Sequence, residues 1–149
     1  MALSAPRDTR TRGEEIVNGG VAASQTIYQG ALVMRNASGY LVKGATATGL
    51  VGVGRAEKTV TNSGSAGDEK LDVRTGCFHF KNSSAGDAIT IAEIGDVCFA
   101  VDDEQVAKTD NSAARSPAGF VQDVDAQGVW VRFDEIALTA YLAGITLPA

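Results

Sequence analysis

The order of hydrophobic and polar positions divides this chain into three parts. Residues 1–15 contain few apolar side chains and include Pro6, so they predict an extended N-terminal arm with little to bury. In residues 16–133, short runs of Val, Ile, Leu and Phe alternate with Gly, Asn, Asp and Ser, which is typical of a mainly β domain. In residues 134–149 the spacing changes again, and this stretch is a C-terminal extension of the β domain.

Three hairpins are predicted within the β domain; the third joins Val97–Val101 to Gln105–Ala107 through the acidic tip Asp102–Glu104. The run Gly30–Met34 predicts a strand, the turn-forming residues Asn36–Gly39 follow it, and Tyr40–Val42 predicts its return partner. Phe120–Val124 and Val129–Phe133 predict a second hairpin, because the residues between them end in a glycine that suits a tight turn. We therefore expect antiparallel pairing to dominate.

The run Leu71–Phe80 alternates with a period of two residues and predicts one continuous strand. Cys77 and His79 fall on one face of this strand, and Phe78 and Phe80 fall on the other. Because apolar residues occur on both faces, we expect this strand to be covered on each side.

The stretch Glu135–Ala143 predicts a short helix, with Asp134 as its N-terminal cap and Gly144 at its end. Its apolar residues at helical spacing are Ile136, Ala140 and Ala143, with Leu138 and Leu142 nearby. A helix of this length is marginal in isolation, so we expect it to dock on another part of the molecule. Earlier in the chain, Thr90–Glu93 has the capping-box pattern and predicts a single helical turn.

Length, composition and charge narrow the possible functions. A chain of 149 residues with 44% hydrophobic content is long enough to bury one domain's core. The net charge is −5, but residues 1–12 hold three arginines against one aspartate, a net of +2, which leaves −7 for the rest. An acidic body argues against nucleic-acid binding. We expect no membrane span and no signal peptide, and therefore use in a cytoplasm.

Candidate catalytic and ligand-binding motifs are weak. The glycines of Gly49–Gly54 suggest a dinucleotide loop, but an extended stretch follows where that motif requires a helix. His79 is the single histidine, and a pair with Cys77 stays open, although a structural histidine is the favoured interpretation. Asp102–Glu104, and Asp123 with Asp125, lack the spacing of a calcium loop. We expect no catalytic residue, metal site or cofactor.

The two cysteines, Cys77 and Cys98, both lie in strand-like runs. A disulfide between neighbouring strands is one interpretation, and two buried, reduced thiols that act as small hydrophobic side chains are the other. The second is favoured for a cytoplasmic protein.

The series of strand-like segments resembles the small capsid decoration, or cement, proteins of tailed bacteriophages, a family formerly described as a conserved domain of unknown function. The segments that carry the resemblance are Thr26–Val33, Val51–Ala56, Val73–Phe78, Ile94–Phe99, Ala118–Val124 and Gly128–Phe133. Their order and spacing fit the family from about residue 20 to residue 133.

The resemblance implies a small β-barrel or β-tulip-like body, commonly a homotrimer, on the outer surface of a capsid. It also implies an N-terminal arm that reaches across neighbouring capsid subunits, here residues 1–15. The arm residues that we expect to contact the capsid are Pro6, Arg7, Thr9, Arg10 and Arg12. The C-terminal extension lies outside the family pattern. Contact with the capsid and contact with a second copy of the chain both remain open as its role.

The sequence thus predicts a structural virion protein, present on the virion surface and in the host cytoplasm during assembly, whose partners are the major capsid protein and itself. The alternative is a β-sandwich binding module for a carbohydrate or a host surface. The apolar residues expected in the core or in subunit contacts are Ile27, Tyr28, Leu32, Phe78, Phe80, Phe99, Phe120, Val129 and Trp130.

Overall fold

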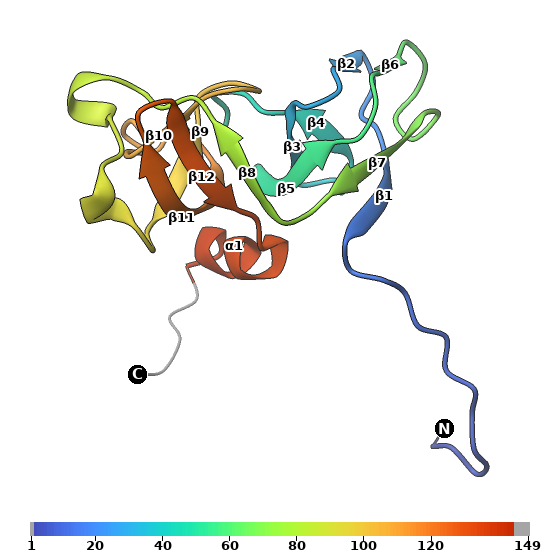
Figure 1. Ribbon diagram of the computed structural model, residues 1–149. Coiled ribbons are helices and arrows are strands. Elements are labelled where there is room, and N and C mark those ends of the chain that lie inside the picture. Colours follow the sequence, from blue (N-terminus) through green and yellow to red (C-terminus); the bar gives the residue numbers. More distant parts are fainter. Residues whose placement is uncertain (1, 145–149) are drawn as a thin grey trace.

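The protein consists of two five-stranded antiparallel sheets, one two-stranded sheet and a short C-terminal helix, in a computed structural model that describes residues 2–144 (Figure 1). The first sheet has the order β1 (Ile16–Gly20), β7 (Lys70–Arg74), β5 (Val51–Ala56), β3 (Leu32–Arg35) and β4 (Leu41–Lys43). The second has the order β10 (Val106–Ala107), β9 (Val97–Ala100), β11 (Pro117–Asp125), β12 (Gly128–Arg132) and β8 (Cys77–Phe80). The small sheet pairs β2 (Gln25–Ile27) with β6 (Val60–Asn62).

The prediction of a mainly β fold with a short C-terminal helix is confirmed, but the sheets do not form a closed barrel. The first sheet is linked across its two edges by one isolated bridge, between Val21 and Leu41, and not by a strand ladder. All three predicted hairpins are present, as β3 with β4, as β11 with β12 and as β9 with β10. The predicted turn is also present, at Ile91–Glu93 with Thr90 and Glu93 as its capping box.

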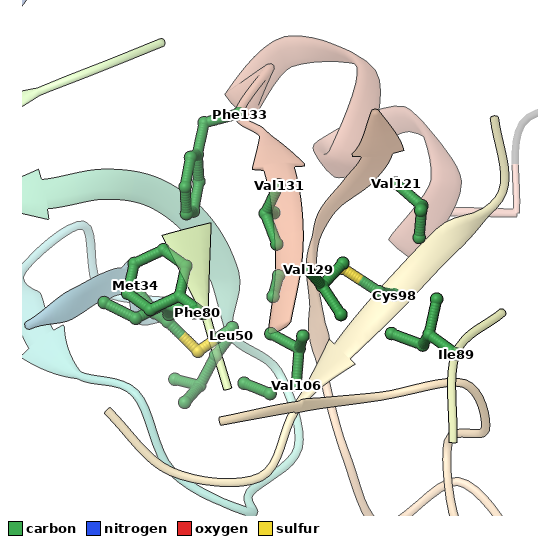
Figure 2. Packing of buried hydrophobic residues seen from close by; sticks show 13 residues of the cluster. Met34, Leu50, Phe80, Ile89, Cys98, Val106, Val121, Val129, Val131 and Phe133 are labelled. Atoms are coloured by element: carbon green, nitrogen blue, oxygen red, sulfur yellow. The ribbon is translucent and has the colours of Figure 1, made fainter. Parts of the chain in front are cut away.

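Two hydrophobic cores stabilise the body, and strand β3 serves both. Val33 belongs to the core of the first sheet, while its neighbours Leu32 and Met34 belong to the core of the second. This follows from the alternation of side chains along a strand, which puts successive residues on opposite faces. Figure 2 shows the second core, where Val129 and Val131 of β12 gather with Cys98 and Phe80.

Close backbone contact between β5 and β11 joins the two sheets. A Cβ atom at Gly52 would overlap the carbonyl oxygen of Ala118, so glycine is required at this crossing. Beside it, the Ser116 hydroxyl accepts a hydrogen bond from the Leu50 amide at 3.0 Å and donates one to the Ala47 carbonyl at 2.6 Å. The body therefore holds its two sheets together through backbone as well as side-chain contacts.

The prediction of one strand over Leu71–Phe80 is wrong. The chain leaves the first sheet at the end of β7 and enters the second as β8, with Thr75 and Gly76 between them. Gly76 has a φ of 149°, a value that favours glycine. Leu71 and Val73 point into the first core and Phe80 into the second, so the buried positions change from odd to even numbers at this turn.

Most of the apolar residues expected in the core or in subunit contacts are at least half-buried. The buried members of that set are Ile27, Leu32, Phe80, Phe99 and Val129. Phe78 and Phe120 are half-buried, whereas Tyr28 and Trp130 are exposed. Tyr28 and Trp130 are therefore the members of this set that remain available for contacts outside the chain.

Candidate functional site

The arm, residues 2–15, forms no helix or strand, and each of its residues is exposed. The predicted contact residues Pro6, Arg7, Thr9, Arg10 and Arg12 all lie in it, and none of these arginines pairs with a carboxylate within residues 2–144. One backbone hydrogen bond, from the Thr9 amide to the Arg7 carbonyl at 3.0 Å, is internal to the arm. The three positive charges are thus presented to solvent.

The arm is anchored to the body at Glu15. The carbonyl of Glu15 accepts a hydrogen bond from the Thr75 amide at 2.9 Å, and its carboxylate lies 3.7 Å from Arg74. Arg74 also approaches Glu57 at 3.4 Å, and Glu57 bonds Arg55 at 2.9 Å, which lowers the pKa of the Glu57 carboxyl. This network fixes the point at which the arm leaves the body.

Two hollows lie at the root of the arm. One of about 400 Å³ is lined by Glu14, Glu15, Thr75, Gly76, Cys77, Gln122, Arg132 and Phe133. The other, of about 430 Å³, is lined by Glu14, Val17, Val53, Thr75, Phe133, Asp134, Glu135 and Ile136. The two share Glu14, Thr75 and Phe133, so they are neighbours at the root of the arm, one beside β8 and the other beside the C-terminal helix.

Helix α1 (Glu135–Leu142) borders the second hollow. Asp134 caps it by accepting a hydrogen bond from the Ala137 amide at 3.1 Å. Arg35 of β3 holds its first turn through a two-pronged ion pair with Glu135, at 2.8 and 3.3 Å. The predicted N-terminal cap at Asp134 and the predicted helix end at Gly144, which has a φ of 74°, are both confirmed.

The face by which α1 docks differs from the one that the sequence suggests. Leu138 is the single buried residue of the helix, whereas Ile136, from the predicted apolar stripe, is 85% exposed. Tyr141 and Leu142 are also exposed, although the Tyr141 ring lies 6.4 Å from the Phe99 ring. The sequence had shown the helix but not the exposed apolar surface that it carries.

A polar cluster on the outer side of the second sheet surrounds Trp130. The indole Nε1 donates to one carboxylate oxygen of Asp125 at 3.0 Å, and His79 Nε2 lies 3.1 Å from the other. The hydrogen bond with His79 and those from the amides of Gln127 and Gly128 lower the pKa of Asp125 to about 2. His79 thus hydrogen-bonds Asp125 and packs beside Trp130, with the two rings 5.0 Å apart.

The two cysteines differ in their surroundings, and the prediction that both are buried is wrong for Cys77. Cys98 lies in the second core, where burial raises the pKa of its thiol to about 12. Cys77 is exposed on β8, and both are free cysteines. Partial burial raises the pKa of the Cys77 thiol as well, which is the opposite of what a thiolate nucleophile requires.

The remaining candidate motifs have packing or turn roles. Gly52 and Gly54 lie in strand β5, where Gly54 approaches the Arg74 carbonyl too closely for a side chain. At the tip before β10, the carboxylate of Asp102 accepts a hydrogen bond from the Glu104 amide. Within residues 2–144, no group of three or more His, Cys, Asp or Glu residues is arranged to hold a metal ion.

None of the helices in the described part of the chain has the length and apolar character required to cross a bilayer. No protein-family model, no curated protein and no solved structure matches this chain.

Proposed function

We propose that this chain is a structural virion protein that binds the outer surface of a phage capsid and stabilises the expanded shell by bridging neighbouring major capsid subunits. The observation that carries this proposal is the fully exposed arm with its three arginines, attached to a mainly β body of opposite charge. The resemblance of the body's segments to decoration proteins supports it.

The arm supplies the bridging contacts in this proposal. Arg7, Arg10 and Arg12 pair with carboxylates of the major capsid protein, and Pro6 and Thr9 contact it through the same extended stretch. An arm without internal structure becomes ordered only on docking, so it covers much surface at modest affinity. The body does not need to change its fold.

Stabilisation of the shell follows from mass action. A protein that binds the expanded lattice more tightly than the broken or immature one shifts the equilibrium toward the expanded form. We further propose that the body is the β-tulip-like domain of the decoration family and assembles as a homotrimer. Three linked contacts bind far more tightly than one when all can engage together.

The experiment that tests this proposal mixes the purified full-length protein with capsids that lack their decoration, followed by imaging of the shells. We expect regular density on the outer surface at saturation. Shells that stay bare while the protein remains folded would contradict the proposal.

A second candidate function, a binding module for a carbohydrate or a host surface, is favoured by Trp130. Its indole is 38% exposed and is held in place by Asp125 and His79, whose ring lies 5.0 Å away. A fixed, partly exposed aromatic ring with polar neighbours is a suitable platform for a ligand with apolar faces. Saturable glycan binding that Trp130→Ala abolishes, together with no binding to capsids, would favour this function over the first.

A further inference from the structure

Helix α1 carries an apolar surface that the body leaves uncovered. Residues 136–144 contain no charged side chain, and Leu138 is the one residue of the helix that is buried. Ile136 is 85% exposed, and Tyr141 and Leu142 are 49% and 44% exposed. A helix that is apolar around most of its circumference is normally covered on most of its surface. A surface outside the described chain is therefore the natural cover for α1.

The arm leaves the body beside this helix. Glu14, in the last residues of the arm, and Val17 of β1 line the same hollow as Asp134 and Ile136. Figure 1 shows the arm extending away from the body on the side that carries α1, opposite to β2 and β6. Fully extended, residues 2–13 span roughly 40 Å. A surface gripped by the arm can therefore lie within reach of α1.

We propose that the exposed residues Ile136, Tyr141 and Leu142 of α1 dock on an uncharged, apolar patch of the same capsid surface that the arm grips. This inference rests on the proposed function and adds a second contact of different chemistry to it. The protein is then attached by a charged arm and by an uncharged helix face that lie next to each other.

The two contacts differ in how salt affects them. Added salt screens the pairs made by exposed arginines, so the contribution of the arm falls as ionic strength rises. Burial of apolar side chains carries no such screening, so the contribution of the helix persists. A second copy of this chain is the competing occupant of the helix face, and its presence there is measurable as a change in oligomeric state.

The test compares two variants of the full-length chain. In the first, Ile136→Ser and Leu142→Ser are combined, which removes apolar surface without touching Leu138. In the control, Ile91→Ser removes a 75% exposed apolar residue from the turn Ile91–Glu93, which belongs neither to the arm nor to α1. Each protein is titrated onto decoration-free capsids by co-sedimentation at low and high salt. Thermal unfolding and light scattering are measured in parallel.

We expect the helix variant to bind about tenfold more weakly than the wild type at both salt concentrations, because it forfeits apolar burial at the contact. The Ile91 control should bind as the wild type does, and both variants should keep the wild-type fold and oligomeric state.

Three results would contradict the inference, and they are distinguishable. Equal binding by the helix variant and the wild type would exclude docking through α1 while leaving the proposed function intact. Loss of self-association in the helix variant would assign its surface to a second copy of the chain. Failure of the wild type to bind capsids at all would overturn the proposed function, and the inference with it.

Discussion

The residues of the body are largely explained by the contacts that they make with one another, whereas the residues of the arm are not. In the body, two cores contain many side chains with no exposed surface, and glycines such as Gly52 allow backbones to meet. In the arm, every side chain of residues 2–15 is exposed, and the arginines have no partner within the described chain. Packing inside the molecule therefore explains the body, whereas the chemistry of the arm indicates a surface outside it.

The largest expected effect comes from comparing a glycine substitution in the body with one in the arm. Gly52→Ala places a Cβ against the Ala118 carbonyl, so it should destabilise the protein by more than about 4 kcal/mol and abolish the folded yield. Gly13→Ala, in the arm, has no atom within 4 Å of the new Cβ and should leave the free energy of unfolding unchanged. Urea titration of both variants measures the difference. A folded Gly52→Ala protein of wild-type stability would show that the two sheets are joined differently.

Helix α1 allows a similar comparison between a buried and an exposed residue within a single element. Leu138→Ala removes a fully buried side chain and should lower the free energy of unfolding by about 3 kcal/mol, as for other buried leucines. Ile136→Ala removes a side chain that is 85% exposed and should change it by less than about 0.5 kcal/mol. Chemical denaturation checks both values. Equal losses would mean that Ile136 is covered in the free protein.

The arm arginines should affect binding and leave stability unchanged. Replacement of Arg7, Arg10 and Arg12 by Ser should weaken capsid attachment by about a hundredfold at low salt, since three exposed ion pairs contribute about 1 kcal/mol each. The deficit should shrink at high salt because screening weakens the same pairs in the wild type.

The matched control for the arginine variant replaces three exposed body lysines, Lys43, Lys58 and Lys70, by Ser. This control changes the net charge by the same amount but leaves the arm intact, so it should bind capsids almost as the wild type does. Comparable losses in the two triple variants, measured by co-sedimentation, would mean that overall charge rather than the arm governs attachment.

The smallest expected effect is a pH dependence at the β11–β12 turn. The pKa of Asp125 lies at about 2, below its ordinary value of 3.8, chiefly because of its hydrogen bond with His79. A carboxylate with a lowered pKa stabilises the fold above the ordinary value, and that contribution disappears as the pH falls from about 4 through about 2. Asp125→Asn should therefore be less stable than the wild type near pH 6, and the difference should narrow near pH 2. A constant difference across this range would contradict the assignment.

Local sequence signals predicted the features that depend on neighbouring residues. Turn and cap chemistry is set within a few residues. The sequence therefore predicted the hairpin of β11 and β12, the capping box at Thr90 and the helix cap at Asp134.

Features that depend on distant parts of the chain were not predicted. The alternation over Leu71–Phe80 suggested one strand because each half buries apolar residues, although in different sheets. The change from odd to even buried positions at Thr75 and Gly76 was the one signal of the break. The exposure of Cys77 and the docking of α1 through Leu138 depend on which strands lie nearby, which spacing alone does not determine.

The central claim is that the arm fastens a folded body to a shell and thereby stabilises that shell. The most direct measurement heats decoration-free capsids with saturating full-length protein, or with a version that lacks residues 2–13, and records the temperature at which the shells break. The account predicts that the full-length protein raises this temperature and that the truncated protein, although folded, raises it much less. Equal protection by both proteins, or protection by neither, would contradict it.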